Sequence, residues 1–394
     1  MTDSTAPEAA PATPAPALLI VATVAGTIAG FLAPYAAHFR SLGWRVEAAA
    51  NGATSDPRLL EAFDRVHELP LSRSLRDVRG LERGRRGLAE ILETTPDIVH
   101  VHTPIASFLT RLAVRQLPRD RRPAVAYTAH GFHFHAAGRA ISNAVFLTAE
   151  RVAGRWTDRL VVISDEDEAA ARRHHIVPRR RLVRMPGIGL DTGFYAPAAV
   201  PADAPGLTRA RLGIPADAPL FAIVGELNRN KRQADVIAAL GGMRHPGTHL
   251  ALAGRGDARG TLEALARDVG AEDRVHFLGN IEDVRPLVRA ATALVLPSKR
   301  EGLARSVMEA LALEVPVIAS TARGNRELVG SDAGIVVETG NVGGFAEAMD
   351  WMIDHPDERP GMGACGRSRM VERYDTTVLF RLHEDLYREM LAER

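Results

Sequence analysis

Two carboxylates in the second half of the chain, Glu301 and Glu309, have a spacing that suits a particular class of ligand. Seven residues separate them in the segment 297–309. The first follows the apolar run 293–296, which predicts a buried strand, and the second lies just inside a helix expected to start near Ser306. A strand-to-helix turn with a glycine presents backbone N–H groups to a phosphate. A carboxylate beside it repels phosphate but accepts hydrogen bonds from sugar hydroxyls, so the segment favours a nucleotide sugar.

The same residues allow a purely structural interpretation. Ser306 and Glu309 have the spacing of a capping box, in which the two side chains satisfy the first N–H groups of a helix. From this segment alone, both interpretations of Glu309 stay open.

A second loop carries two cations between an expected strand and a helix expected over 233–240. Gly225 would let the backbone approach a ligand, while Arg229 and Lys231 would supply positive charge to a diphosphate. Cations at a helix N-terminus oppose the helix dipole unless an anion binds there too. Lys231 and Lys299 are the only lysines in the chain, and both lie in candidate phosphate loops.

Two further glycine turns each follow an expected strand, one at Gly254 and one at Gly279 and Ile281. Each turn alone is a common connection. Because both lie at the carboxyl ends of strands, they could form the walls of a base pocket.

Histidines end two expected strands of the first half. His130 could hydrogen-bond a sugar hydroxyl or assist proton transfer, and His102 could line the same cleft. His100 lies in the middle of its strand, where a core position satisfied by the backbone competes with a position in the cleft. The spacing of His130, His133 and His135 is poor for a closed zinc site, so we expect no metal there.

The acidic segment after Ser164 contains an Asp-x-Asp pattern that could suggest a divalent metal. Ser164 is a natural N-cap, and acidic residues are favoured in the first turn of a helix. We therefore expect a capped helix and no metal ion.

Strand-like runs alternate with helical patterns along the whole chain, which predicts parallel sheets in an α/β fold. At 394 residues, two domains are expected. The fold class is thus two doubly wound, Rossmann-like domains that face each other across a cleft. The expected parts are a disordered tail (1–17), a first domain (18–195), a second domain (196–375) that begins with a Pro/Ala-rich linker (196–206), and a C-terminal helix (376–394) that packs back toward the first domain. The expected strands are 18–24, 45–49, 98–102, 124–128 and 159–163, then 220–224, 248–253, 274–277, 293–296, 315–319 and 334–337.

Composition and charge limit the expected partners and cellular location of the protein. The net charge of +1 gives no support for a nucleic-acid partner, and the single Cys365 fits a reducing compartment, so we expect a cytoplasmic protein. Prolines and glycines interrupt the uncharged run 9–39, which predicts a strand and a helix rather than a membrane span. The arginine-rich segment 71–92 has two open interpretations. It is either a basic amphipathic surface against the anionic inner face of a plasma membrane or a solvated basic loop, since its glycines weaken a helix.

Several ordered motifs together resemble the retaining glycosyltransferases of family four, which have the GT-B architecture, from residue 18 onward. They are closest to the subgroup that builds capsular polysaccharides and exopolysaccharides on lipid carriers. The motifs are Thr128-Ala-His-Gly-Phe-His-Phe134, Pro186-Gly-Ile-Gly189, Val224-Gly-Glu-Leu-Asn-Arg-Asn-Lys231, Arg300-Glu-Gly-Leu-Ala-Arg-Ser-Val-Met-Glu-Ala310 and Ala322-Arg-Gly-Asn-Arg-Glu-Leu-Val329.

The resemblance implies roles for individual residues. The catalytic set is His130, Glu301 and Lys231. The donor-binding set is Gly26, Gly225, Arg229, Lys231, Gly254, Gly279, Ile281, Leu303, Ala304, Arg305, Ser306 and Glu309. The acceptor-binding set is His102, Thr103, Phe132 and Ser164. Glu226 departs from the family pattern, which often has arginine there, so Arg229 or Arg305 would have to replace that phosphate contact.

The function that the resemblance implies is retaining, metal-independent transfer of a hexose or N-acetylhexosamine from a UDP-sugar, without a cofactor. The acceptor would be a glycan or a polyprenyl-diphosphate-linked glycan of a cell-surface polysaccharide. A UDP-sugar epimerase of the same architecture and a non-catalytic sugar-nucleotide-binding module remain alternatives. A nicotinamide oxidoreductase is disfavoured because no G-x-G-x-x-G follows the first strand.

Overall fold

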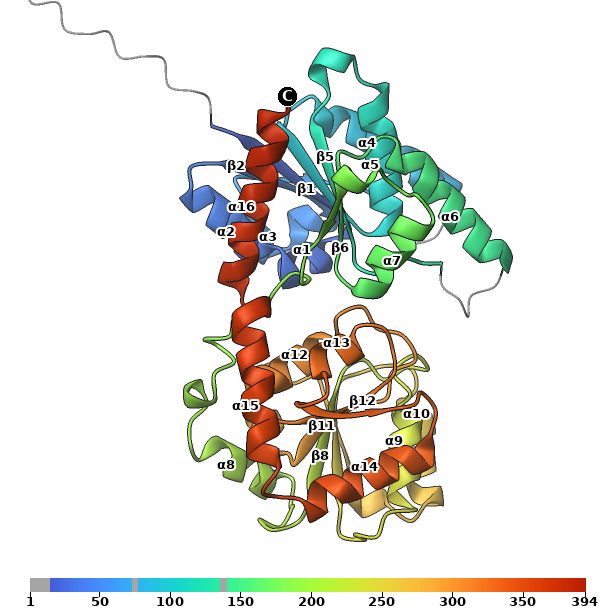
Figure 1. Cartoon of the computed structure of the whole chain (residues 1–394), viewed down its shortest axis with the longest axis vertical. Helices are drawn as coiled ribbons and strands as arrows, with labels where there is room; N and C mark the ends of the chain where they lie inside the picture. Colours follow the sequence, from blue (N-terminus) through green and yellow to red (C-terminus); the bar gives the residue numbers. More distant parts are fainter. Residues whose placement is uncertain (1–14, 73–76, 135–139) are drawn as a thin grey trace, which may run out of the picture.

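The computed structural model describes residues 15–72, 77–134 and 140–394. Within these residues the chain forms a seven-stranded sheet and a six-stranded sheet, one in each half. Figure 1 shows two domains, one above the other, with the last helices running along one side of both. The predicted α/β fold with two doubly wound domains is therefore confirmed.

The first sheet has the strand order β3-β2-β1-β4-β5-β6-β7, and its neighbouring strands are parallel. The direction of winding reverses between β1 and β4, so the carboxyl ends of these strands border the crevice where such sheets bind ligands. The strands are β1 (Ala17–Val24), β2 (Arg45–Asn51), β3 (Arg65–Glu68), β4 (Ile98–His102), β5 (Ala124–Ala129), β6 (Arg159–Val162) and β7 (Leu182–Arg184).

Helices cover both faces of this sheet. One face packs against α1 (Ala25–Phe31), α2 (Ala33–Ser41), α3 (Pro57–Ala62) and the C-terminal α16 (Thr376–Ala392). The other face packs against α4 (Val78–Leu92), α5 (Pro104–Gln116), α6 (Ala140–Gly154) and α7 (Asp165–Arg173). The central strands β1, β4, β5 and β6 are buried on both faces, which explains their largely apolar sequences, whereas the edge strands β3 and β7 are partly exposed.

The second sheet repeats this plan with the order β10-β9-β8-β11-β12-β13, again parallel. Its strands are β8 (Leu220–Val224), β9 (His249–Ala253), β10 (Val275–Gly279), β11 (Ala293–Leu296), β12 (Val317–Ser320) and β13 (Gly334–Val337). Its helices are α8 (Ala204–Arg211), α9 (Gln233–Leu240), α10 (Arg259–Asp268), α11 (Arg285–Ala290), α12 (Arg305–Ala312), α13 (Asn325–Val329), α14 (Val342–Asp354) and α15 (Arg359–Arg369).

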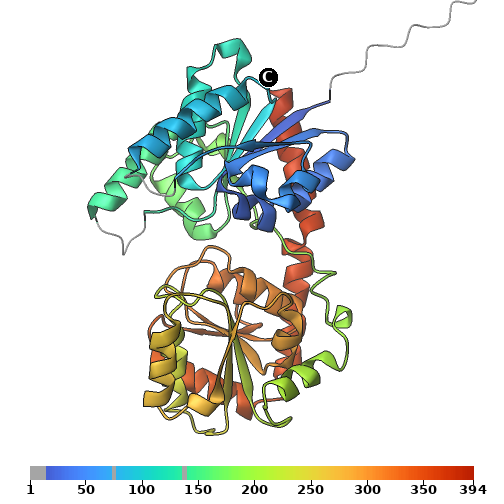
Figure 2. The ribbon, with the colours of Figure 1, turned by 180° about the vertical axis from the view of Figure 1, so that it is seen from behind.

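The chain crosses between the domains twice. After α15, a π-helical turn over Met370–Tyr374 leads into α16, which lies beside the first domain in both views (Figures 1 and 2). Leu379, Leu386 and Met390 of α16 are part of that domain's core. The other crossing lies earlier than expected, since Leu190 and Tyr195 pack in the core of the second domain rather than the first.

The arginine-rich segment contains a continuous helix, α4, rather than a loop. Its glycines do not break it, because they let the helix approach the preceding segment closely. A Cβ on Gly84 would lie 2.3 Å from Leu71, and one on Gly87 would lie 3.3 Å from Leu69. Arg73 and Arg76 fall outside the described residues.

The structure agrees with one expectation about the first 41 residues and differs from another. The uncharged run folds as β1, α1 and α2, and in the described part of the chain none of the helices has the length and apolar character needed to cross a bilayer. β1 passes directly into α1, so Gly26 lies in the first turn of a helix and not in a loop.

Candidate active site

The side chains of Lys231 and Glu301 meet at the carboxyl ends of the second sheet. The ammonium Nζ of Lys231 lies 2.7 Å from Oε1 of Glu301, and both side chains are largely buried. Lys231 precedes α9, whose bounds agree with the prediction, and Glu301 lies in the loop between β11 and α12. A lysine beside a carboxylate keeps the local charge near zero until an anion arrives.

Two asparagines explain why these loops meet. The side-chain oxygen of Asn228 accepts hydrogen bonds from the N–H groups of Asn230 and Lys231, each at 3.0 Å, which fixes the turn before α9. Asn230 then joins the two loops. Its amide donates to the carbonyl of Arg300 at 3.0 Å, and its own carbonyl accepts from the N–H of Lys299 at 2.7 Å.

The capping-box interpretation of Glu309 is wrong. Helix α12 begins at Arg305, its N-cap is Ala304, and no side chain caps it. Glu309 is buried instead, and its Oε1 accepts hydrogen bonds from the hydroxyl of Tyr195 at 2.8 Å and from Nε of Arg305 at 2.9 Å. Burial and the adjacent Glu309 carboxylate raise the pKa of Tyr195.

Arg305 connects this helix to the first domain. Besides its ion pair with Glu309, it donates to the carbonyl of Gly30 at 3.0 Å and lies over the ring of Phe31. Gly26, in the same helix α1, has open space where a Cβ would lie. The arginine at this position therefore ties the start of α12 to the first helix of the opposite domain.

The three predicted glycine turns come together beside β8. Gly225 donates its N–H to the carbonyl of Ala253, and Gly254 donates to the carbonyl of Gly279 at 2.7 Å. A Cβ on Gly254 would lie 1.9 Å from the carbonyl oxygen of Gly225, so only glycine allows this approach. Ile281 closes a pocket of about 320 Å³ over these turns, in which Glu226 stands where the family often has arginine.

His130 faces a pocket between the two domains. This pocket, of about 530 Å³, is lined by His130 and Phe132 from one domain and by Glu301 and Gly302 from the other. Burial lowers the pKa of His130 to about 4, so the ring is neutral at pH 7. A Cβ on Gly302 would lie 2.7 Å from the carbonyl oxygen of His130, which shows how closely the domains approach here.

The residues expected to bind the acceptor do not all reach this pocket. Phe132 lines it. Ser164 is 1% exposed and His102 is 2% exposed; the hydroxyl of Ser164 contacts Asp167, and Nδ1 of His102 contacts His130. Thr103, at a strained φ of 70°, hydrogen-bonds Thr23 through its hydroxyl. Contrary to the prediction, Ser164 and His102 can act on a ligand only through their neighbours.

Ser164 has its predicted capping role. Its hydroxyl accepts from the N–H of Asp167 and donates to Oδ2 of Asp167 at 2.7 Å. The Asp-x-Asp pattern is engaged by arginines. Arg323 of the second domain contacts Asp167 at 2.7 Å and Glu166 at 3.0 Å.

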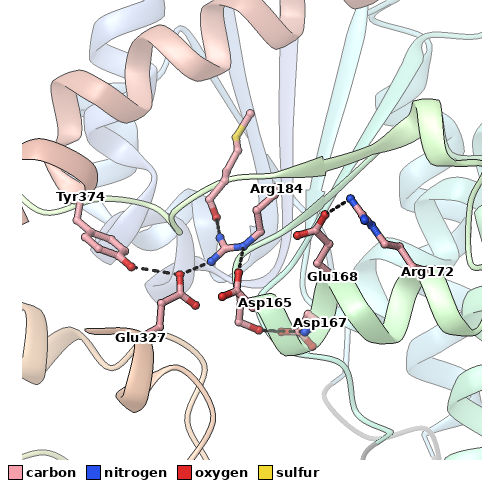
Figure 3. Close-up of polar contacts among 9 residues, drawn as sticks. Asp165, Asp167, Glu168, Arg172, Arg184, Glu327 and Tyr374 are labelled. Carbon is pink, nitrogen blue, oxygen red and sulfur yellow. Dashed lines mark hydrogen bonds and ion pairs between the residues drawn. The ribbon is translucent and has the colours of Figure 1, made fainter. Parts of the chain in front are cut away.

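A second ionic contact joins the domains near the same helix. Figure 3 shows Arg184, at the end of β7, between Asp165 on α7 and Glu327 on α13. The hydroxyl of Tyr374 also donates to Glu327, at 3.3 Å. These contacts hold the domains with their strand ends toward each other.

Arg323 and Tyr195 were missed from the sequence. Arg323 follows β12, so its place after a strand end was a usable signal, although its partner on α7 was not visible in the sequence. Tyr195 gives no local signal, because its contact with Glu309 spans 114 residues.

The remaining predicted donor residues surround the start of α12. Leu303 lies against Gly187, Ala304 is buried, and Ser306 is within the first turn. Arg229 does not line the pocket of His130 and Glu301. It lines a neighbouring pocket of about 1060 Å³, also between the domains, together with His133, Lys299 and Arg300.

Among the described residues, no group of three or more His, Cys, Asp or Glu side chains could hold a metal ion. His135 lies outside the described residues. Independence from metals stays a prediction.

Two facing parallel α/β domains, with a pocket between their strand ends and a helix crossing back at the C-terminus, form the GT-B architecture. Residues 32–188 match the model described as Glycosyltransferase Family 4, and residues 207–369 match Glycosyl transferases group 1. The chain is 34% identical to EpsD of Bacillus subtilis (strain 168), which is named as a glycosyltransferase, over 89% of this chain and 91% of that protein. The chain belongs to glycosyltransferase family 4, and it is a glycosyltransferase.

Two further proteins are similar over most of their length. The UDP-Gal:alpha-D-GlcNAc-diphosphoundecaprenol alpha-1,3-galactosyltransferase of Escherichia coli is 26% identical over 76% of each chain. The crystal structure of Anabaena HepE in complex with UDP has a TM-score of 0.80 at 18% identity, over 95% of this chain and 100% of that one, which supports the fold.

Proposed function

We propose that this glycosyltransferase transfers a hexose or N-acetylhexosamine from a UDP-sugar to a glycan or polyprenyl-diphosphate-linked acceptor, with retention of configuration and without a metal. The observation that carries the proposal is the pocket in which His130 of one domain meets Glu301 and Gly302 of the other. Lys231 forms an ion pair with Glu301, and α12 begins at Arg305, shortly after Glu301 in the chain. We place the reaction in the cytoplasm, as part of cell-surface polysaccharide synthesis.

The donor fits the second domain. The uracil would occupy the pocket over Gly225, Gly254 and Ile281, and the ribose hydroxyls would donate to Glu309. Glu309 is prepared for this because its Oε1 already accepts from Tyr195 and Arg305. The galactosyltransferase and HepE, as named above, involve UDP-Gal and UDP, which supports a uridine nucleotide here.

The leaving group needs positive charge. As the bond from the anomeric carbon to the diphosphate breaks, negative charge grows on the phosphate oxygens, and preorganised donors at that point lower the barrier. Lys231 and the N–H groups at the start of α12 would supply it. In this proposal the acceptor hydroxyl attacks on the face that the diphosphate leaves and gives its proton to a departing phosphate oxygen. Retention rests on family membership alone.

The acceptor is expected from the first domain, next to His130 and Phe132. Contact of the basic α4 with an anionic membrane is part of this proposal, because Arg83 and Arg86 are exposed on that helix. A lipid-linked acceptor would make such contact useful, since the substrate remains in the bilayer.

The test is product formation by the whole chain. The four common UDP-hexoses and UDP-N-acetylhexosamines are incubated with and without polyprenyl-diphosphate-linked sugars, and the product linkage is determined by NMR. Acceptor-dependent release of UDP with an α-linked product from an α-linked donor supports the proposal. Conversion of the UDP-sugar without acceptor would indicate an epimerase, binding without turnover a non-catalytic module, and a β-linked product would exclude retention.

A further inference from the structure

A buried histidine lies directly behind His130. His102 ends β4, and its Nδ1 lies 3.0 Å from Nε2 of His130. The two rings are nearly parallel, with centroids 5.3 Å apart. We propose that His102 is a positioning residue. Its Nδ1–H donates to Nε2 of His130, which fixes His130 as the tautomer whose Nδ1–H faces the substrate. The identity of the substrate rests on the proposed function, but the tautomer does not.

The ring of His102 is held in place from the other side. The ring of His100 lies 4.3 Å from it. His100 itself is fixed at both nitrogens, with Nε2 2.7 Å from the hydroxyl of Thr128 and Nδ1 2.5 Å from the hydroxyl of Tyr387 on α16. A ring packed between two others in a dense core cannot turn to another partner.

The rings share a protonation state. Burial lowers the pKa of His102 and of His130, so both are neutral near pH 7. A neutral imidazole has one N–H donor and one bare acceptor nitrogen. The contact between them is therefore a single N–H···N hydrogen bond, and either ring could be the donor.

The far nitrogen of His102 decides between the two directions. His102 Nε2 is fully buried and has no hydrogen-bond partner among the described residues. If His130 donated, the proton of His102 would sit on that nitrogen as a buried donor without an acceptor, which is rare in proteins. If His102 donates from Nδ1, only a bare lone pair is left there. The second direction leaves fewer unsatisfied groups.

This direction determines what His130 can do. With Nε2 accepting from His102, the proton of His130 is on Nδ1. That nitrogen has no hydrogen-bond partner among the described residues, and His130, unlike His102, is only partly buried. Because His130 lines the pocket between the domains, it offers a hydrogen-bond donor there. It has no free lone pair with which to act as a base toward an acceptor hydroxyl.

The direct test is the tautomer of His130, read from two-bond ¹H–¹⁵N spectra of the ¹⁵N-histidine-labelled full chain without substrate. We expect the Nδ1–H form in the wild type. In His102→Phe a planar aromatic ring is kept and the donor is lost, so His130 should shift toward the Nε2–H form. In His102→Asn the side-chain amide can replace Nδ1–H, and the Nδ1–H form should return.

Activity provides the second readout. If a sugar-transferring reaction is confirmed, we expect His102→Phe to lower kcat about tenfold or more with UDP affinity unchanged, and His102→Asn to recover part of it. His276→Phe is the matched control, since His249 and His276 form the same N–H···N contact at 3.0 Å on the second domain, away from the pocket. It should change neither the tautomer of His130 nor turnover.

Two results would overturn the inference. One is an Nε2–H form of His130 in the wild type, and the other is a tautomer that does not respond to His102→Phe. If His102→Phe does not fold, the wild-type spectrum and His102→Asn still decide. Absence of turnover with every sugar nucleotide would count against the proposed function and leave the tautomer result standing.

Discussion

The ammonium group of Lys231 and the carboxylate of Glu301 lie 2.7 Å apart, although 70 residues separate them along the chain. They meet because Asn230 joins their two loops by hydrogen bonds. In the absence of donor, each side chain satisfies the charge of the other. A diphosphate that enters this site would compete with Glu301 for Lys231, so the ion pair sets the lysine in place before the ligand arrives.

The first prediction concerns that lysine. Lys231→Ala should lower kcat by about 10²- to 10³-fold, the loss typical of removing one donor to a developing negative charge. Steady-state kinetics and thermal unfolding would measure this. Lys231→Arg keeps the charge but not the compact ammonium group, so its kcat should lie between that of the wild type and that of Lys231→Ala. Unchanged turnover in Lys231→Ala would remove this residue from the mechanism.

The second prediction separates binding from stability at Glu309. Glu309→Gln keeps the shape but weakens the hydrogen bonds expected from the ribose, so UDP affinity should fall about tenfold, since hydrogen bonds to charged groups contribute about 1.5–3 kcal/mol. Calorimetric titration with UDP measures it. Tyr195→Phe removes one donor to Glu309 and should weaken UDP binding less. A loss of thermal stability with unchanged UDP affinity would assign Glu309 a structural role only.

The third prediction uses the close approach of the domains at Gly302. A methyl group there would lie 2.7 Å from the carbonyl oxygen of His130, so Gly302→Ala should push the domains apart. We expect kcat/KM to fall at least tenfold, since misplacement by about 1 Å can cost that much or more. UDP binding should persist. Gly361→Ala on α15, where the new Cβ would meet open space outside its own helix, is the matched control. Equal activity of both variants would show that this contact does not limit the reaction.

The fourth prediction is that no metal takes part. In the Asp-x-Asp pattern, Asp167 contacts Ser164 and Arg323 and Asp165 contacts Arg184, and Lys231 offers the charge that a cation would otherwise supply. Activity after dialysis against EDTA should equal that of the untreated protein, and added Mn²⁺ should not raise it. Activity that disappears with EDTA and returns with Mn²⁺ or Mg²⁺ would contradict the proposed mechanism.

The fifth prediction follows from buried histidines of the first domain. Burial lowers the pKa of His100 and His102, and it lowers the pKa of His130 and His383 to about 4. The unfolded chain therefore binds more protons than the folded one below pH 6.5. The contribution of these histidines to the free energy of unfolding should be fully present above that pH. It should fall as the pH drops toward 4, by up to about 1.4 kcal/mol per pH unit for each histidine.

Denaturant unfolding at pH 7, 6 and 5 would measure this slope. His383→Phe keeps an aromatic ring against Tyr35 and removes one titrating group, so its slope should be shallower than that of the wild type. Identical slopes would mean that His383 does not resist protonation.

Local sequence patterns gave the architecture but not every element. The strands buried on both faces were predicted to within one or two residues, because their apolar runs are continuous. The edge strand β3 was missed, since it has four residues and is partly exposed, and β7 was missed with three. The helix α4 was left open because glycines normally weaken a helix. Its glycines are used for packing against Leu69 and Leu71, a contact that composition does not reveal.

In the candidate site, too, some residues could be predicted from the local sequence and others could not. Gly225, Lys231 and Glu301 could be selected because each follows a strand end and has the right chemistry. The capping-box pattern at Ser306 was misleading, because the N-cap of the helix is Ala304, two residues before Ser306. Arg323 and Tyr195 act through contacts with distant parts of the chain. Such partners depend on how two domains meet, which local spacing cannot determine.

The first domain shares its core with α16, which follows the whole second domain in the chain. During translation, residues such as Phe39 and Tyr35 emerge from the ribosome long before Leu386 and Tyr387 arrive to cover them. The apolar face of the nascent first domain therefore stays exposed until α16 has been synthesised, and such a face is a natural binding site for chaperones. A premature stop codon that removes only α16 would leave this face open and make the shortened product a target for proteolysis.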